Sequence, residues 1–181
     1  NWGFNTENYE AVNKLAEILW VGINMVGGYF AQQGFSDGDI TNQRFSDSAI
    51  LLLRQAIAAA NRTGNSRTES AHLGNLGNAY RNLGQFGQAI DCYKQSLKIH
   101  RRIRDKQGET ADLGNLALAY RELGQIEKAK DFHERSLSIS RRIGDRQSEG
   151  NQLGNLGTIF RILANLKQAE KHFEEALIIS R

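Results

Sequence analysis

Apolar residues recur along the chain at the spacing of amphipathic helices. From residue 70 to 84 they fall three or four positions apart, on one face of a helix: Leu73, Leu76, Ala79, Tyr80 and Leu83. Gly84 then supplies the residue type best suited to leave a helix in a left-handed conformation. A second series starts near Phe86 and fades into a polar turn at 105–108: Ala89, Ile90, Tyr93, Leu97, Ile99 and Ile103. The pattern predicts a helix hairpin.

The hairpin pattern returns at a fixed period of 40 residues. The letters Leu-Gly-Asn-Leu at 73–76 recur at 113–116 and at 153–156, with no insertion between the copies. Gly77, Ala117 and Gly157 follow the motif, and a glycine inside a helix costs about 1 kcal/mol relative to alanine. Small residues at this position therefore indicate a close approach of two helices. A fixed period of this size is typical of a solenoid, so we predict an all-α stack of antiparallel helix hairpins.

Residues 1–70 are expected to form a degenerate first hairpin. Ala49-Ile50 aligns with Ala89-Ile90, which predicts a second helix from Asp47 to Arg62. A long, apolar first helix is expected from residue 7 or 8 to 33, and an inserted polar loop over 35–48. The regular units are expected at 71–110, 111–150 and 151–181, the last without its closing turn or a capping helix. The array would then hold about four hairpins.

The composition fits a folded, helical protein. Hydrophobic residues make up 40% of the chain and charged residues 24%, and there is no proline. The single cysteine, Cys92, excludes an internal disulfide and fits a reducing compartment, so we expect a cytoplasmic protein. The most apolar stretch, 15–30, is too short and too interrupted to span a bilayer. The chain begins at Asn1 rather than methionine, from which we expect a segment of a longer protein.

Basic clusters raise the question of nucleic acid. The net charge is +3, and arginines gather at 100–104 and 141–144. They recur at the end of each second helix, where cations favour the negative end of the helix dipole, and acidic residues follow at once. Nucleic acid is therefore an unlikely partner.

Candidate chemistry is nearly absent. The four histidines (72, 100, 133 and 172) form no metal pair at helical spacing, and Cys92 occupies a position held by Phe132 and His172 in the other copies. The run Asp37-Gly38-Asp39 lacks the further oxygen ligands of a calcium loop and is typical of a surface turn. We expect no enzyme activity, no cofactor and no metal site.

The repeated residues resemble the tetratricopeptide repeat (TPR). The resemblance rests on the following residues of the first regular copy, which have counterparts in the next two: Leu76, Gly77, Tyr80, Gly84, Phe86, Ala89, Tyr93 and Leu97. The usual period is 34 residues, and Arg101, Arg141 and Arg181 replace the proline that usually closes the second helix. We expect the six extra residues to lengthen the second helix and its turn. This 40-residue variety is similar to repeats of G-protein-signalling-modulator scaffolds, of kinesin light chains and of the arms of bacterial signal-transducing NTPases.

The resemblance implies a right-handed superhelix whose first helices line a concave groove. Polar residues on these helices are the candidate peptide-binding set: Asn75, Asn78, Arg81, Asn115, Arg121, Asn155 and Arg161. An asparagine amide can pair with both polar groups of an extended peptide backbone, and arginine favours a partner with acidic side chains. Alternatively, the asparagines cap or bridge neighbouring helices and the arginines are merely solvated. Both interpretations stay open at this stage.

The sequence supports two functions of different classes. The first is a scaffold that binds proteins or extended peptides in the groove. The alternative is a sensor or autoinhibitory arm of a larger signal-transducing (STAND/NB-ARC-like) NTPase, which packs on a neighbouring domain of its parent chain. A third, weaker option is self-association through the exposed end of the last repeat.

Overall fold

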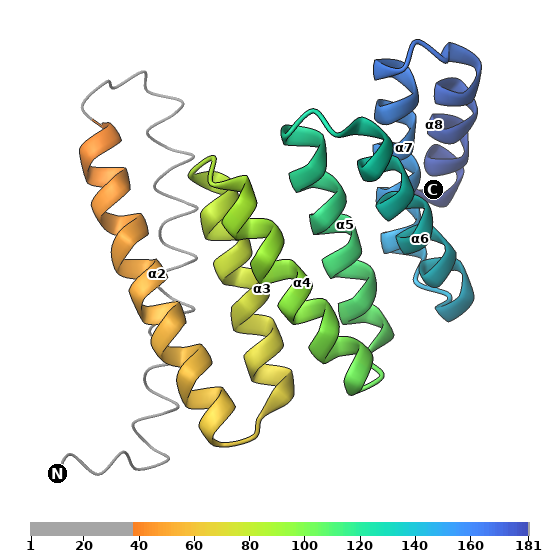
Figure 1. The fold of residues 1–181 in the computed structure, drawn as a ribbon. Helices are drawn as coiled ribbons and strands as arrows, with labels where there is room; N and C mark the ends of the chain where they lie inside the picture. Colours follow the sequence, from red (N-terminus) through yellow and green to blue (C-terminus); the bar gives the residue numbers. More distant parts are fainter. Residues whose placement is uncertain (1–37, 181) are drawn as a thin grey trace, which may run out of the picture.

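The computed structural model describes residues 38–180, and these form helices joined by short turns (Figure 1). The described helices are α2 (Gly38–Arg62), α3 (Ser66–Asn82), α4 (Phe86–Arg102), α5 (Lys106–Glu122), α6 (Ile126–Ile143), α7 (Arg146–Ile162) and α8 (Leu166–Ser180). No strand occurs in this part of the chain, so the predicted all-α class is confirmed.

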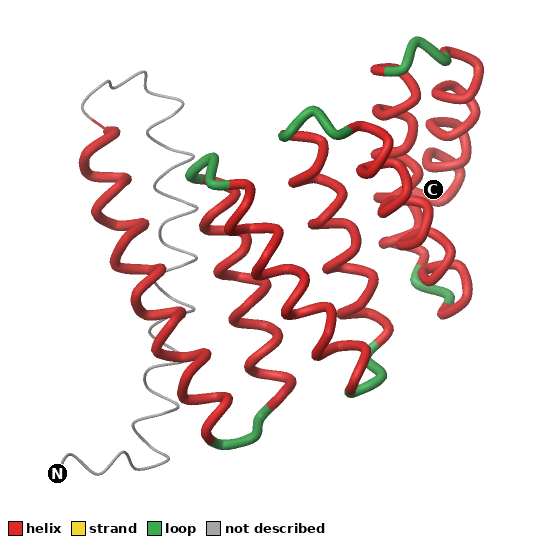
Figure 2. Tube along the Cα trace, in the orientation of Figure 1, coloured by secondary structure: helices red, strands yellow, loops and turns green. Residues whose placement is uncertain are grey.

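Consecutive helices run antiparallel and pack side by side. The pairs α3/α4, α5/α6 and α7/α8 form three hairpins, and α2 packs on α3 as the second helix of a preceding unit. We call α3, α5 and α7 the first helices, and α2, α4, α6 and α8 the second helices. The turns lie alternately on two opposite edges of the array (Figure 2). The predicted first helix at 7–33 lies outside the described residues.

The backbone repeats every 20 residues, twice as often as the sequence. One residue after each helix adopts a positive φ between 56° and 72°, at positions 64, 84, 104, 124, 144 and 164. Gly84 is among them, as predicted. First and second helices are nearly equal in length, at 17 or 18 residues from α3 to α7. The expectation that the extra residues lengthen the second helix and its turn was wrong for the turn, because turns of two or three residues follow first and second helices alike. The first helices are also as long as the second ones, because they begin early.

Asp105 explains why the first helices begin early. Its side chain accepts a hydrogen bond from the backbone N–H of Gly108 at 2.9 Å, which caps α5. Residues 106–108, predicted as a polar turn, are consequently the first turn of the helix. Asn65 and Asp145 cap α3 and α7 through the same contact to the residue three positions on.

The predicted loop over 35–48 is corrected by the structure from residue 38 onward, and residues 35–37 lie outside the described part of the chain. From Gly38 onward this segment is helical and continuous with the predicted helix that ends at Arg62. The segment holds no proline, and extending an existing helix costs far less than starting one. Polar, turn-prone residues were therefore not sufficient to interrupt α2.

The core lies between first and second helices along the array. Its main cluster is built from α2, α3, α4 and α5 around Leu53, Tyr93, Leu113 and Leu116, each at most 1% exposed. A smaller cluster joins α6, α7 and α8 around Leu137, Leu153 and Leu156. Each hairpin thus packs only on its immediate neighbours, as in other solenoids.

Candidate functional site

The first helices lie on the inner side of the array. Helix α5 approaches both α3 and α7 directly, whereas no pair of second helices comes comparably close. In a curved stack the elements on the inner side are nearer to one another. The face that α3, α5 and α7 turn away from the second helices is therefore the candidate concave surface.

A small residue in each first helix admits a ring from the second helix. A Cβ on Gly77 would lie 2.5 Å from Cε1 of Tyr93, and one on Gly157 would lie 2.6 Å from Cε1 of Phe173. The middle hairpin has Ala117 at this position, and its matching ring residue is His133. A five-membered imidazole takes less room than a six-membered ring, which accounts for the alanine. The predicted packing role of these small residues is confirmed.

The recurring asparagines lie on the part-exposed face of the first helices. Asn75, Asn115 and Asn155 are half-buried, one position before a buried leucine. None of the three side chains hydrogen-bonds another described residue. None of these amide atoms is among the described polar atoms that are buried without a partner, so the three amide groups reach solvent.

Asn78 differs from the other asparagines because it has a partner inside the hairpin. The Tyr93 hydroxyl donates to Oδ1 of Asn78 at 2.7 Å, so the ring that passes Gly77 is bonded to α3 through its hydroxyl. Burial raises the pKa of Tyr93 to about 12, which keeps this hydroxyl a donor. Asn78 retains its two N–H donors but has committed its acceptor.

The three arginines do not share one environment. Arg81 and Arg121 are half-buried and Arg161 is exposed. Arg121 donates to Glu122 at 2.8 Å, a pair that a ligand carboxylate would have to displace. Each first helix thus carries one of these arginines in its last turn, and Glu122 partly neutralises the middle one, Arg121.

A recurring contact joins each second helix to the next first helix. Arg101 donates to Glu109 at 2.8 Å across the α4–α5 turn, and Arg141 donates to Glu149 at 3.0 Å across the α6–α7 turn. Asn61 makes the matching bond to Glu69 across the α2–α3 turn at 2.9 Å. From the sequence, these arginines were expected only to favour the helix dipole and to replace the proline that usually closes the second helix. Their constant spacing of eight residues from a glutamate was the signal that could have revealed the pairing.

A buried polar cluster lies between α4 and α5. His100 Nδ1 donates to Oδ2 of Asp112 at 2.7 Å, and Ser96 lies 3.4 Å from the same nitrogen. The bond to Asp112 raises the pKa of His100. A catalytic triad would need the serine at the opposite ring nitrogen, and Ser96 is fully buried and donates to the Ser70 carbonyl. The cluster is therefore structural rather than hydrolytic.

The next junction, between α6 and α7, uses a different polar pair. His133 is fully buried, and its Nδ1 donates to Oε1 of Gln152 at 2.7 Å. Burial lowers the pKa of His133 to about 4, so the ring is neutral near pH 7. Sequence reasoning missed both junction pairs because each joins residues of different repeats.

The described residues offer little other chemistry. Cys92 is buried, and burial raises the pKa of its thiol to about 11, so it is not an activated nucleophile. The described part of the chain contains no group of side chains that could hold a metal ion. None of its helices is both long and apolar enough to cross a bilayer.

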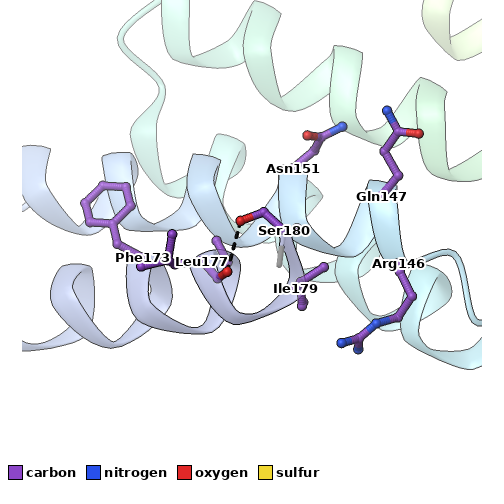
Figure 3. A pocket seen from close by; sticks show the side chains of 9 residues that line it. Arg146, Gln147, Asn151, Phe173, Leu177, Ile179 and Ser180 are labelled. Atoms are coloured by element: carbon purple, nitrogen blue, oxygen red, sulfur yellow. Dashed lines mark hydrogen bonds between the residues drawn. The ribbon is translucent and has the colours of Figure 1, made fainter.

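The last hairpin carries a pocket between α7 and α8 (Figure 3). Arg146, Gln147 and Asn151 line it from α7, while Phe173, Leu177, Ile179 and Ser180 line it from α8. Leu137 occupies the repeat position of Leu177 in the preceding hairpin, where α7 covers it. Leu137 is 7% exposed and Leu177 is 54% exposed. This end face therefore presents apolar surface that is buried at the internal junctions.

Comparisons with known proteins agree with this geometry. Two family models, each described as "Tetratricopeptide repeat", match residues 71–102 and 109–181. Together they cover more than half of the chain. A search of curated protein sequences finds no match.

Solved structures of similar fold share little sequence with the chain. BtubC from P. vanneervenii aligns with a TM-score of 0.69 at 20% identity, over 77% of this chain and 58% of that one. The nearly identical TPR-like repeats of a Podosopora anserina protein described as a kinesin light chain align with a TM-score of 0.66 at 18% identity, over 97% and 96%. A STAND protein with a tetratricopeptide repeat sensor from Pyrococcus horikoshii aligns with a TM-score of 0.70 at 18% identity, over 99% and 31%.

The chain thus spans little more than half of BtubC and about a third of the STAND protein. At these identities the likeness concerns the fold. The 40-residue hairpin repeat, the small-residue contacts inside each hairpin and the family matches lead to one conclusion. The chain belongs to the tetratricopeptide-repeat family.

Proposed function

We propose that the chain is a protein-interaction scaffold whose concave surface binds an extended peptide. The observation that carries the proposal is the row formed by Asn75, Asn115 and Asn155, which recurs every 40 residues and has no hydrogen-bond partner among the described residues. Each amide can donate to a peptide carbonyl and accept from a peptide N–H. Repetition at the spacing of the solenoid suits a ligand with a regular backbone.

The energetics call for a second contribution besides the asparagines. A hydrogen bond contributes about 0.5–1.5 kcal/mol net, so three bidentate pairs give roughly 3–9 kcal/mol before the ordering of the peptide is subtracted. That supports weak binding, on the order of micromolar. Arg81, Arg121 and Arg161 would add charge-assisted bonds to acidic side chains of the ligand. The proposed ligand is therefore an extended, acidic peptide segment.

The experiment combines selection with matched variants. Peptides are first selected from a phage-displayed random library against the wild-type protein, and their affinities are measured by fluorescence anisotropy. Asn115→Ala with Arg121→Ala should weaken binding about tenfold or more, because it removes a bidentate pair and an ion pair. The control changes Gln95 and Lys98, which are exposed on α4, to alanine. Selected peptides that bind both double variants equally would contradict the groove proposal.

A second candidate function is a sensor arm of a larger signalling NTPase. It is favoured by the similarity of nearly the whole chain to a STAND protein with a tetratricopeptide repeat sensor. In such an arm the concave surface or the end face would pack on a neighbouring domain. The gene that encodes the chain provides the test. A nucleotide-binding module encoded in frame with the repeats is expected, and a gene that encodes repeats alone would contradict this alternative.

A further inference from the structure

One edge of the array concentrates positive charge. The turns α2–α3, α4–α5 and α6–α7 all lie along this edge, opposite the other three turns (Figures 1 and 2). The windows 61–69, 101–109 and 141–149, which contain these turns, hold nine arginines or lysines against five acidic residues. The whole chain has a net charge of only +3, so the excess is localised at this edge.

Most of the carboxylates on this edge are engaged in holding the fold. Glu109 and Glu149 are buried, and each accepts from two cations of its own turn. Asp105 and Asp145 cap the first helices. These acids therefore neutralise Arg101, Arg141 and their neighbours but not the remaining cations.

Four arginines on the edge are left without a strong carboxylate partner, and we call them the edge arginines: Arg67, Arg102, Arg104 and Arg142. Arg67 is 81% exposed and its nearest carboxylate oxygen, on Asp105, is 3.8 Å away. Arg102 reaches only the hydroxyl of Ser66 at 3.1 Å. Arg104 and Arg142 are exposed and have no ion-pair or hydrogen-bond partner among the described residues.

Arg104 adds an independent observation, because its backbone is strained. Its φ is 59°, in the left-handed region, where four of the six equivalent turn positions carry glycine. A side chain in this conformation costs roughly 1–2 kcal/mol. The turn geometry imposes this conformation, because Ala164 adopts it as well. An arginine at position 104 therefore places an exposed guanidinium on the edge where glycine would carry less strain.

We propose that the edge arginines form a second docking surface, separate from the concave groove, for an acidic segment of a partner protein. Guanidinium groups pair bidentately with carboxylates. The Asp105 carboxylate follows Arg104 in the chain and lies 3.8 Å from Arg67, where it would repel a continuous phosphate backbone. A peptide can instead place its separate carboxylates at the other edge arginines. The three windows also contain no aromatic residue on which a nucleobase could stack. These features favour a protein over a nucleic acid.

The test uses a fluorescein-labelled oligo-glutamate peptide as the probe and measures anisotropy over a range of salt concentrations. The edge variant replaces Arg102, Arg104 and Arg142 with glutamine. The control variant removes the same charge by replacing Lys94, Lys98 and Lys167, which are exposed on α4 and α8, with glutamine. A groove variant replaces Arg81, Arg121 and Arg161 with glutamine. Circular dichroism melting confirms that each variant is folded.

The edge variant should bind the probe about tenfold more weakly than wild type at low salt, with a smaller difference as salt rises. The control variant should bind within about twofold of wild type. The groove variant removes only the contribution of the groove to binding of an acidic peptide, so its remaining affinity should still fall about tenfold when the edge changes are added to it. Equal losses in all three variants would show a net-charge effect and overturn the proposal. A loss confined to the groove variant would overturn it as well, while leaving the groove function intact.

Two further probes separate the classes of partner. Oligothymidylate and vesicles that contain phosphatidylserine are measured with the same variants. Tighter, edge-dependent binding of either one than of the peptide would overturn the assignment of a protein partner.

Arg104→Gly gives a readout that a purely structural role would not. Relief of the strained backbone should raise the melting temperature, whereas loss of the guanidinium should weaken peptide binding by about twofold to fivefold. Ala164→Gly makes the same backbone change on the opposite edge and should stabilise without any change in binding. Unchanged binding by Arg104→Gly would contradict the proposal.

Discussion

At the scale of single residues, the described part of the molecule has six turn positions with a positive φ, one between each pair of consecutive helices. Glycine occupies four of them, while Arg104 and Ala164 occupy the other two. Each turn satisfies its helix end with the same backbone bonds, such as Ala164 N–H to Arg161 O at 3.1 Å. The conformation is therefore set by the hairpin geometry, and the residue type only decides how much strain it carries.

Ala164→Gly should stabilise the protein by about 0.5–1 kcal/mol, because relief of left-handed strain exceeds the added entropy of the unfolded chain. Urea denaturation at constant m-value measures the gain. Gly124→Ala is the matched control, with a φ of 70°, and should lose about 1 kcal/mol. A loss of stability by Ala164→Gly would show that the strain is not present in solution.

At the scale of helices, the sequence predicted the packing inside each hairpin but not the side-chain pairs that join one hairpin to the next. The apolar spacing, Gly84 and the small residues at position 77 and its repeats depend on neighbours inside one hairpin, so a single repeat predicts them. His100 meets Asp112, and His133 meets Gln152, only after two hairpins have packed together. No local pattern encodes that meeting.

The candidate asparagines and arginines could be predicted from the sequence only in part. Their periodic positions could be predicted from the sequence, as could their place on the first helices. The bond from Tyr93 to Asn78 and the pairing of Arg121 with Glu122 could not, because they depend on the rotamers that the packed hairpin allows. The start of α2 at Gly38 was missed because local turn propensity was outweighed by continuation of a long helix.

His100 and His133, the histidines of the two junctions, should change the free energy of unfolding in opposite directions as the pH rises. The pKa of His100 is raised by Asp112, so its contribution is present below its unfolded pKa of about 6.5 and is lost as pH rises through the folded value. The pKa of His133 falls to about 4, so its contribution is present above pH 6.5 and is lost on acidification. As the pH falls from 6.5 to below 4, the free energy of unfolding should decrease by about 3 kcal/mol because of His133.

Urea unfolding between pH 4.5 and 8.5 would measure both effects, at pH values spaced by about half a unit. His100→Gln should flatten the alkaline side of the stability profile, and His133→Gln should reduce the loss on the acidic side. Profiles of both variants that match wild type would contradict the assignment of these titrations to the α4–α5 and α6–α7 junctions.

At the scale of the whole molecule, stability is a sum over neighbouring hairpins rather than a property of one central core. The main core cluster and the smaller cluster of the last hairpin lie at different places along the array. The same residue type can therefore differ in importance with its place in the array. Leu137 and Leu177 hold one repeat position, but only Leu137 is covered by a following helix.

Leu137→Ala should cost about 2–4 kcal/mol, because it opens a cavity under α7. Leu177→Ala should cost less than about 1 kcal/mol, since 54% of that side chain is already exposed. Thermal and urea unfolding measure both. If the two variants lose equal stability, then the end face is covered in solution, and light scattering would show whether a second copy covers it.

The unlike polar pairs at the two junctions bear on how the chain avoids assembling in the wrong order. Nearly identical hairpins can exchange places during folding, which is a known failure of repeat proteins. If α7 packed on α4 in place of α5, Gln152 would face His100, and both Asp112 and His133 would lose their partners. A buried carboxylate without its partner is expensive, so the misordered stack would be disfavoured. The differences between the repeats thus favour the native order of the hairpins over the misordered one, although the sequence otherwise repeats itself.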